Sequence, residues 1–292
     1  MTERREVLVI GGGPAGVSAA IYARRAGRSV TLLADGGGAL SRAEKIENYY
    51  GLPQPVSGAE LAAQGLAQAE RLGVECVTGQ AVDLGFGETL TVSTPETTYA
   101  ADAVVLAVGS PRQAPKLPGL AEFDGKGVSW CAVCDGFFCR GRHAAVLGSG
   151  EYAMHEAAAL LPLAGQVTIL TDGQPLTAPV PEGAAVDARP LLALEGDDLL
   201  RRVTFTEGPA LEVARLFVAL GTAGAAELAK KVGAVTDNGR IAVDSGMATN
   251  VPGLFAAGDC TGGLTQVAKA VYEGAQAGLS AAAYVRKNGK GE

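Results

Sequence analysis

The residues with the most distinctive chemistry are two cysteines at Cys-x-x-Cys spacing, Cys131 and Cys134, followed directly by Asp135. Two thiols at this spacing can close a disulfide, and a helix that begins there favours the thiolate of one of them near neutral pH. Asp135 can move the proton that thiol–disulfide exchange requires. A zinc site would need a second pair of ligands, and the remaining cysteines and histidines offer no such spacing. The spacing therefore predicts redox chemistry without a metal.

A glycine-rich turn near the N-terminus, Gly11-Gly-Gly-Pro-Ala-Gly16, follows an apolar strand and precedes an alanine-rich helix. The first glycine permits the tight turn, Gly13 lets the backbone approach a pyrophosphate, and the last lets helix and strand pack closely. The pyrophosphate would lie at the N-terminus of the helix, where free N–H groups favour negative charge. Asp35 lies at the end of the next strand, where it suits a ribose hydroxyl. The pattern predicts a dinucleotide cofactor.

The pattern recurs in the middle of the chain. Gly148-Ser-Gly150 follows the apolar strand 144–147, Ala153 serves as the third small residue, and the sequence predicts a helix over 154–161. Two such units in one chain indicate an internal duplication. We therefore predict an α/β fold with two Rossmann-like nucleotide-binding domains of the three-layer ββα type, the second inserted into the first.

The predicted domain boundaries follow from the elements on either side of the second unit. A proline-rich segment at 111–118 is typical of a linker, and two more apolar strands, 213–220 and 254–257, precede a final helix from about 266 to 285. The expected division is a cofactor-binding domain formed by 1–113 and 221–292, with the redox-active domain at 114–220.

The second glycine turn lacks the cations that a 2′-phosphate requires. No lysine or arginine occurs between Arg142 and Arg189, and the second strand of the unit ends in Thr171-Asp-Gly173. Asp172 would repel NADP, although it could accept a ribose hydroxyl of NAD. Four prolines between 175 and 190 exclude the next helix of a doubly wound unit. These features favour a second domain that serves as a scaffold.

Composition narrows the class of protein. The chain has 292 residues and a net charge of −7, which argues against a nucleic-acid partner. No apolar run approaches the length of a membrane span, and no targeting segment is visible, so we expect a cytoplasmic protein without membrane contact. Five cysteines on a long chain are unlike a secreted disulfide scaffold. Cys76, Cys139 and Cys260 are expected to be buried fillers, with Cys139 open as a resolving thiol.

Taken together, the motifs of this chain resemble the low-molecular-weight, bacterial-type thioredoxin reductases over its whole length. The stretches that carry the resemblance are Gly11-Gly-Gly-Pro-Ala-Gly16, Gly37-Gly38 with Glu47-Asn48, Cys131-Ala-Val-Cys134-Asp135-Gly-Phe-Phe138, Leu216-Phe-Val-Ala-Leu-Gly221 and Phe255-Ala-Ala-Gly-Asp259. The resemblance implies a homodimeric flavoenzyme that holds FAD in the split domain and reduces thioredoxin. It also implies that Cys134 faces the flavin, Cys131 attacks the partner disulfide and Asp135 is the general acid.

The FAD contacts that we expect come from the glycine turn together with this resemblance. They are Gly11, Gly13, Pro14, Ala15, Gly16, Asp35, Gly38, Ala39, Leu40, Asn48, Val82, Gly109, Gly258, Asp259, Gln266, Val267 and Ala268.

The chain also departs from this family. Members that use NADPH carry His-Arg-Arg and a further Arg where this chain has Thr171-Asp-Gly173 and prolines, and Ala39 and Thr265 replace the usual Gln and Arg. The departures resemble the pyridine-nucleotide-independent thioredoxin reductases, some of which are driven by reduced ferredoxin. Ferredoxin is thus the predicted donor, with NADH as the alternative. An oxygen-dependent dithiol oxidase and a non-catalytic flavin redox sensor also stay open.

Overall fold

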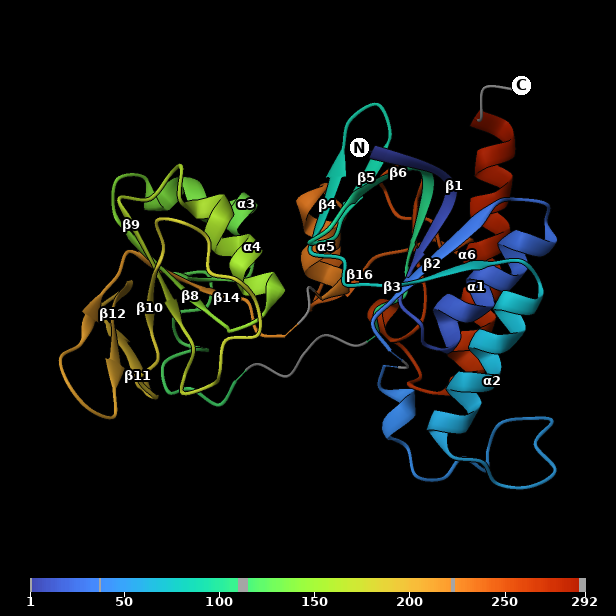
Figure 1. Ribbon diagram of the computed structural model, residues 1–292, viewed down its shortest axis with the longest axis horizontal. Helices are drawn as coiled ribbons and strands as arrows, with labels where there is room; N and C mark the ends of the chain where they lie inside the picture. The colour runs from blue at the N-terminus through green and yellow to red at the C-terminus, as the bar shows by residue number, and fades with distance from the viewer. Residues whose placement is uncertain (1, 37, 110–114, 222–223, 289–292) are drawn as a thin grey trace. The chain divides into compact units, whose positions relative to one another are not determined.

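The computed structural model describes residues 2–36, 38–109, 115–221 and 224–288. Contacts between residues divide the chain into two compact units, which Figure 1 displays. The first unit comprises 1–112 and 224–292, and the second unit comprises 113–223. The second unit therefore interrupts the first along the chain.

The first unit is built on a sheet of parallel strands that is buried on both faces. Leu8 and Val9, which alternate along β1, are both fully buried, as expected for a parallel sheet covered on each side. β1 begins before the apolar run 7–10 because its first half pairs with the first half of β6. In spatial order the parallel strands are β3 (Glu75–Thr78), β2 (Val30–Ala34), β1 (Thr2–Ile10), β6 (Thr98–Leu106) and β17 (Leu254–Ala256).

Three helices cover one face of this sheet, and an antiparallel extension through β4 (Asp83–Phe86) and β5 (Leu90–Ser93) continues from β6. Small residues let two of the helices cross closely, because a Cβ at Gly274 would lie 2.1 Å from the carbonyl oxygen of Ala15. The helices are α1 (Pro14–Arg25), α2 (Gly58–Arg71) and α6 (Val267–Asn288). The shorter elements are η1 (Leu40–Arg42), α5 (Ala225–Lys231), β15 (Thr236–Asp237), β16 (Arg240–Ile241) and η3 (Asp259–Thr261).

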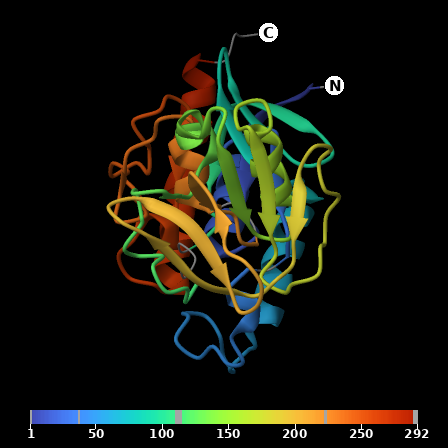
Figure 2. The same cartoon turned by 90° about the vertical axis from the view of Figure 1, so that its left-hand side faces the viewer.

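The second unit repeats this architecture with a five-stranded parallel sheet and a three-stranded antiparallel sheet, whose strands Figure 2 displays from the front. Leu194 and Val203 of the antiparallel sheet share one core with Leu147 and Leu216 of the parallel sheet. The parallel order is β10 (Ala185–Asp187), β9 (Gln166–Leu170), β8 (His143–Leu147), β14 (Arg215–Val218) and β7 (Val128–Ser129). The other elements are β11 (Leu191–Gly196), β12 (Leu200–Phe205), β13 (Leu211–Glu212), α3 (Ala132–Asp135), η2 (Gly136–Cys139) and α4 (Glu151–Leu160).

The predicted fold class is confirmed: both units have the Rossmann-like layers, and the second is inserted into the first along the chain. The helix predicted over 154–161 begins earlier, at Glu151, because it starts directly after the turn at Gly150. No helix forms over 171–184, as the prolines there predicted. The linker proline Pro111 lies outside the described residues. Within the described ranges, no helix has both the length and the apolar character needed to cross a membrane.

Candidate functional site

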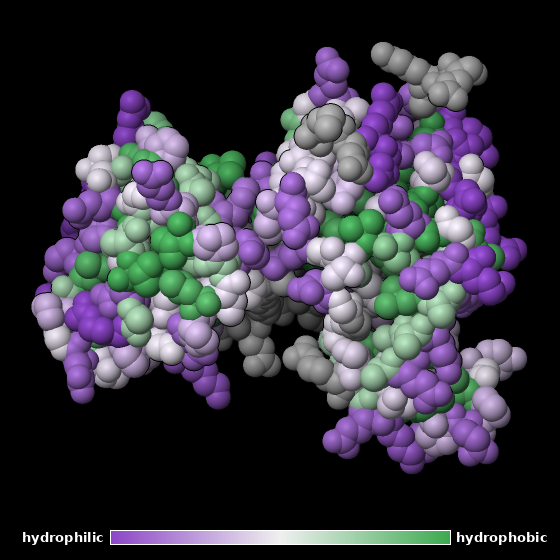
Figure 3. Space-filling model, viewed as in Figure 1, coloured by the Kyte–Doolittle hydropathy of each residue, from purple (hydrophilic) through white to green (hydrophobic). Residues whose placement is uncertain are grey.

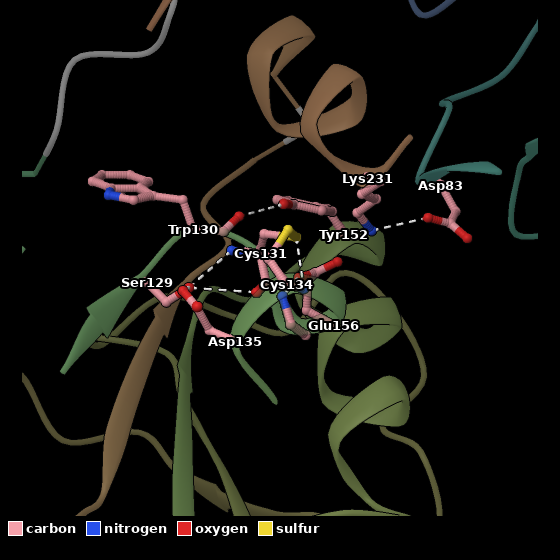
Figure 4. The surroundings of a disulfide bond; sticks show 10 residues. Asp83, Ser129, Trp130, Cys131, Cys134, Asp135, Tyr152, Glu156 and Lys231 are labelled. Carbon is pink, nitrogen blue, oxygen red and sulfur yellow. Dashed lines mark hydrogen bonds and ion pairs between the residues drawn. A yellow bond between two sulfur atoms is a disulfide. The ribbon is translucent and has the colours of Figure 1, made fainter. Parts of the chain in front are cut away.

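The two cysteines of the Cys-x-x-Cys motif form a disulfide at the start of α3. Their Cα atoms lie 5.4 Å apart, and Cys131 caps the helix, with its Sγ accepting the N–H of Cys134 at 3.1 Å. Figure 4 shows this bond and its neighbours. Cys131 is 3% exposed, whereas Cys134 is exposed. The predicted attack by Cys131 stays a prediction, and it requires the sulfur of Cys131 to become accessible once the bond opens.

Asp135 is held by a serine that the sequence analysis did not single out. The hydroxyl of Ser129, buried at the end of β7, donates to Oδ2 of Asp135 at 2.6 Å. The same hydroxyl accepts the N–H of Cys131 at 3.3 Å. One polar side chain thus links the carboxylate to the backbone of the disulfide. The available signal was a serine that ends an apolar strand two residues before the first cysteine.

The surface beside the disulfide is apolar and open. Val133, Phe137 and Phe138, which we call the redox-helix patch, are 59%, 66% and 56% exposed. The guanidinium of Arg215 lies 4.6 Å from the centre of the Phe138 ring. Large apolar side chains exposed together are typical of surfaces that bind other proteins.

The glycine turn of the first unit has the geometry of a phosphate cradle. Gly11 has φ +114°, and a Cβ there would lie 2.3 Å from the carbonyl oxygen of Ala107. A Cβ at Gly16 would lie 1.8 Å from the carbonyl oxygen of Gly11, so only glycine fits at these two positions. Gly13 differs, because nothing lies within 4 Å of a Cβ built there. The backbone of Gly13, at the N-terminus of α1, therefore faces open space.

A cavity of about 280 Å³ adjoins this turn. Four of the expected cofactor residues, Gly13, Pro14, Leu40 and Val267, lie in its wall although they are far apart in the sequence. The rest of the wall is largely apolar and includes residues of α2 that the sequence analysis missed, because α2 carries no motif. The additional lining residues on α2 are Leu61, Ala62, Gln64, Gly65 and Gln68.

A half-buried ion pair supports the turn that carries Asp259. Lys269 and Glu273, one turn apart on α6, lie 2.8 Å from each other. Lys269 donates to the carbonyl oxygen of Gly258 at 2.7 Å, and Glu273 accepts the N–H of Gly258 at 2.9 Å. The pair fixes the backbone that presents Asp259 at the end of β17. The sequence gives no sign of this role, because i, i+4 ion pairs are common on solvated helix faces.

The remaining expected cofactor residues occupy several loops of the first unit. Asn48 and Gln266 come together, with the Asn48 amide donating to the Gln266 side chain at 2.9 Å. Val82 is buried, and its N–H donates to the carbonyl oxygen of Ser93. Gly37 of the Gly-Gly pair lies outside the described residues. The others lie after β2 (Asp35, Gly38, Ala39), after β6 (Gly109), after β17 (Gly258, Asp259) and in the first turns of α1 and α6 (Ala15, Gly16, Ala268).

The second glycine turn repeats the backbone of the first but is covered. A Cβ at Gly148 would lie 2.3 Å from the carbonyl oxygen of Ala219, as at Gly11. Thr177, from the loop after β9, donates its N–H to the carbonyl oxygen of Ser149 at 2.9 Å. Its hydroxyl donates to the same oxygen at 3.3 Å, and it would lie 3.3 Å from a Cβ on Gly150. The position that matches the open Gly13 is thus occupied by the protein itself.

The other three cysteines lie outside the disulfide. Cys139 and Cys260 are buried, and Cys76 is partly buried. Burial raises the pKa of the Cys139 thiol, and it raises the pKa of Cys260 to about 12. The burial of Cys139 and Cys260 agrees with the expectation that they fill space in the core, and their lack of a redox role stays a prediction. In the described part of the chain, no three His, Cys, Asp or Glu side chains gather into a candidate metal site.

These shifts give a labelling prediction. With a pKa near 12, about one Cys260 thiol in 10⁴ is ionised at pH 8, and alkylation proceeds through the thiolate. Iodoacetamide at pH 8 should therefore modify Cys131 and Cys134 of the reduced native protein and leave Cys139 and Cys260 unmodified. Peptide mass mapping measures this, with urea-unfolded protein as the control in which all five cysteines react. Rapid labelling of Cys139 in the native protein would contradict this prediction and favour a role for Cys139 as a resolving thiol.

The fold and the two sites define a disulfide oxidoreductase with a dinucleotide-binding architecture. The family model of the pyridine nucleotide-disulphide oxidoreductases matches residues 5–274, and the chain belongs to that family. A thioredoxin reductase of Streptomyces coelicolor is 37% identical, covering 89% of this chain and 87% of that protein. A thioredoxin reductase of Listeria monocytogenes is 32% identical, covering 97% of this chain and 94% of that protein. The relatives therefore place the chain among the low-molecular-weight thioredoxin reductases within that family.

Two solved structures are similar over nearly the whole chain. The atypical thioredoxin reductase TRi from Desulfovibrio vulgaris Hildenborough has a TM-score of 0.92 and 36% identity, covering 98% of this chain and all of that one. A ferredoxin-flavin thioredoxin reductase from Clostridium acetobutylicum has a TM-score of 0.75 and 29% identity, covering 99% and 100%.

FAD is the cofactor of this family, and the first unit fits it. The open backbone at Gly13 and the N-terminus of α1, which has no side-chain cap, suit a pyrophosphate. The adjoining cavity continues between α1, α2 and η1 with the apolar wall that a large aromatic cofactor needs. Nothing in the described part of the turn fills this cradle, in contrast to the covered turn of the second unit.

Proposed function

We propose that this protein reduces thioredoxin through the Cys131–Cys134 disulfide, and that it receives its electrons from reduced ferredoxin rather than from NADPH. Membership of the thioredoxin reductase family supports the first part. The relative from Clostridium acetobutylicum, named a ferredoxin-flavin thioredoxin reductase, supports the second. The proposed enzyme is a homodimer, as the resemblance of the sequence implies, and it acts in the cytoplasm, as expected from a sequence in which no targeting segment is visible.

The observation that carries the proposed donor is the contrast between the two glycine turns. Both have the tight first glycine, but Gly13 faces open space while Thr177 lies over Gly150. Thr177 makes two hydrogen bonds to the carbonyl oxygen of Ser149. A pyrophosphate at this turn would have to displace the loop that carries Thr177. Among the described residues of the second unit, the glycine turn thus offers no open cradle for a pyridine nucleotide.

The charges around the second turn also argue against NADPH. Arg189 is the first cation after Arg142, and it is already used: it pairs with Asp187 at 2.6 Å and stacks on Phe205, with 3.8 Å from its guanidinium to the ring centre. It also donates to two backbone carbonyls. No cation of the loop 171–184 is available to neutralise a 2′-phosphate.

NADH is disfavoured for a related reason. Asp172, which could hold a ribose hydroxyl, accepts the N–H of Leu191 at 2.7 Å and so serves to fasten the loop to β11. The surface over β10 and this loop is largely apolar (Figure 3), with Leu176 and Val186 among its exposed large side chains. Such a surface suits neither the ribose nor the phosphates of a dinucleotide.

The exchange itself needs only residues of the second unit. When bound, FAD supplies the electron pair that converts the disulfide to a dithiol. In the proposed order, the Cys131 thiolate attacks the partner's disulfide and forms a mixed disulfide, which releases one partner thiolate. Cys134 then attacks the sulfur of Cys131, closing the original bond and releasing the second partner sulfur. Asp135, held by Ser129, takes up the proton of the attacking Cys131 thiol and then, as general acid, gives it to the leaving partner thiolate.

Partner recognition is assigned to the redox-helix patch. Its exposed aromatic side chains lie directly after the disulfide, where an incoming protein must dock for its own disulfide to reach Cys131. Arg140 and Arg142 are also exposed, so an acidic rim on the partner would be complemented.

An anaerobic titration tests the proposed donor. Reduced ferredoxin, added in steps, should bleach the flavin absorbance and, with oxidised thioredoxin present, produce one thioredoxin dithiol per two ferredoxins consumed. NADPH and NADH in large excess should leave the absorbance unchanged. A bacterial thioredoxin reductase that uses NADPH is the positive control for nucleotide quality.

The outcomes separate the alternatives. Rapid bleaching by micromolar NADPH would show that the loop of Thr177 moves aside, and the proposed donor would be wrong. Peroxide release when a dithiol is added in air would instead identify an oxygen-dependent dithiol oxidase. If the flavin is reduced by ferredoxin but thioredoxin is not, the proposed partner is wrong.

A further inference from the structure

The second unit contains a buried carboxylate that the proposed exchange does not use. Glu156, in the middle of α4, is 1% exposed. Its Oε2 accepts the N–H of Ala132 at 2.6 Å, and Ala132 directly follows Cys131. The carboxylate therefore lies against the peptide that joins Cys131 to Ala132, where its charge can act on the redox pair.

A second side chain of α4 holds the same peptide from its other end. Tyr152, one helical turn before Glu156, is 2% exposed, and its hydroxyl donates to the carbonyl oxygen of Trp130 at 3.2 Å. Side chains of α4 thus form hydrogen bonds with the backbone of the residues before and after Cys131. Figure 4 shows Tyr152 and Glu156 on one side of the disulfide, and Ser129 and Asp135 on the other.

Glu156 and the sulfur of Cys131 bind amides of the same short turn. The carboxylate accepts a hydrogen bond from the N–H of Ala132, and the sulfur accepts one from the N–H of Cys134. Because the N–H of Ala132 donates to the carboxylate, it cannot also donate to a thiolate of the redox pair and stabilise it. Cys131 is 3% exposed, so water screens a charge beside it only weakly. The negative charge of Glu156 therefore raises the free energy of a Cys131 thiolate, whereas it leaves a neutral disulfide nearly unaffected.

We infer that the charge of Glu156 sets the reducing power of the Cys131–Cys134 pair. Because the charge disfavours the anionic reduced form and not the disulfide, the dithiol gives up its electrons more readily than it would beside a neutral side chain. Glu156 is a positioning residue, since it acts through the peptide of Ala132 rather than on a substrate. The inference rests on the proposed function only in that the electrons leave for a partner disulfide.

The test is a thiol–disulfide equilibrium that needs neither thioredoxin nor an electron donor. The FAD-loaded protein is equilibrated anaerobically at pH 7 with reduced and oxidised dithiothreitol. The Cys131–Cys134 bond breaks and gains two electrons, while the dithiol of the reagent loses two electrons and closes its own disulfide. The protons released by the reagent pass to the protein thiols and the buffer. Acid quenching, alkylation and mass measurement then give the reduced fraction.

Glu156→Gln keeps the shape and an acceptor for the Ala132 N–H but removes the charge. We expect its equilibrium constant to move about tenfold toward the reduced protein, which corresponds to about 30 mV for a two-electron couple. The reduced variant should also be alkylated faster at pH 7, because more of its thiol is ionised. An unchanged constant, or a shift toward the disulfide, would overturn the inference.

Matched variants separate charge from packing. Tyr152→Phe removes the hydrogen bond to the carbonyl oxygen of Trp130 without changing the charge. Glu182→Gln removes the charge of an exposed acid in the same unit. Both should stay within about twofold of the parent constant, and a tenfold shift in either would overturn the role of the buried charge. If Glu156→Gln does not fold, Glu156→Asp, which retains the charge, should stay within about threefold, and a tenfold shift would equally overturn it. If the parent protein reaches the thiol–disulfide equilibrium with dithiothreitol but does not reduce thioredoxin, the proposed function is wrong, and the inference about Glu156 is still tested by its variants.

Discussion

Replacing either Cys131 or Cys134 by serine is expected to lower thioredoxin reduction by about 10³-fold or more while the yellow FAD stays bound. The disulfide is the only one among the described residues, and no other cysteine is placed to substitute for either sulfur. Removing one nucleophile of a pair that acts as a unit removes nearly all of its effect. The flavin should remain because its cradle lies in the first unit and the cysteines lie in the second.

The same variants identify which sulfur attacks the partner. If Cys131 attacks, Cys134→Ser should accumulate a stable mixed disulfide with a single-cysteine thioredoxin supplied as its 2-nitro-5-thiobenzoate mixed disulfide, because neither protein then has a second thiol of the pair that could release the linkage. Cys131→Ser should not. The structure makes this comparison informative, since Cys131 is buried and Cys134 exposed. Non-reducing electrophoresis of the reduced variants with thioredoxin measures the trapped species, and the reverse pattern would assign the attack to Cys134.

Cys139→Ala is the matched control for these measurements. Cys139 is buried close after the pair in sequence, and it is not part of the proposed exchange. Its replacement should leave turnover within about twofold, since a small side chain replaces a slightly larger one. Full turnover in Cys134→Ser, with the flavin bound, would contradict the proposed function itself.

Gly13→Asp is expected to give a folded but nearly colourless protein, with FAD affinity lowered about 100-fold or more. Gly13 has φ −77° and no atom within 4 Å of a Cβ, so the backbone and its surroundings accept a side chain. The added carboxylate would stand where the pyrophosphate must approach the N-terminus of α1, and the two negative charges repel. Fluorescence titration of the apoprotein with FAD measures the affinity, and circular dichroism checks the fold.

Gly13→Ala separates steric from electrostatic effects at the same position. It adds one methyl group in open space, so the apoprotein should fold normally, and its loss of FAD affinity should be much smaller than that of Gly13→Asp. Equal affinities for Gly13→Asp and the parent protein would mean that the pyrophosphate does not lie at this turn. An unfolded Gly13→Ala protein would mean that the space beside Gly13 is needed by the chain itself.

Local sequence patterns predicted most of the fold. Strand–turn–helix units around Gly11 and Gly148 are marked by patterns of about 30 residues each. The contact that requires Gly16 lies inside its unit, at the carbonyl oxygen of Gly11, whereas Gly11 and Gly148 face the carbonyl oxygens of Ala107 and Ala219. The prolines of 171–184 likewise exclude a helix by local chemistry alone. The start of α4 was misplaced by three residues, since a polar first turn gives a weak helix signal.

The candidate site was predictable where a motif marked it. Cys131, Cys134 and the phosphate turn were found from spacing alone. Ser129, Glu156 and the Lys269–Glu273 pair were not, because their roles come from contacts with residues on other elements. The sequence does not distinguish a buried glutamate on a helix from a solvated one, because burial depends on which other elements pack against that helix.

Sequence by itself determined that this chain has two dinucleotide-type turns and one redox pair, because each is a short pattern with a fixed backbone requirement. The tertiary structure decided which of the two turns is open. Gly13 and Gly150 look equivalent as letters, but the loop that carries Thr177 returns to cover only the second. That difference arises from a hydrogen bond between residues 28 positions apart, which no local pattern encodes.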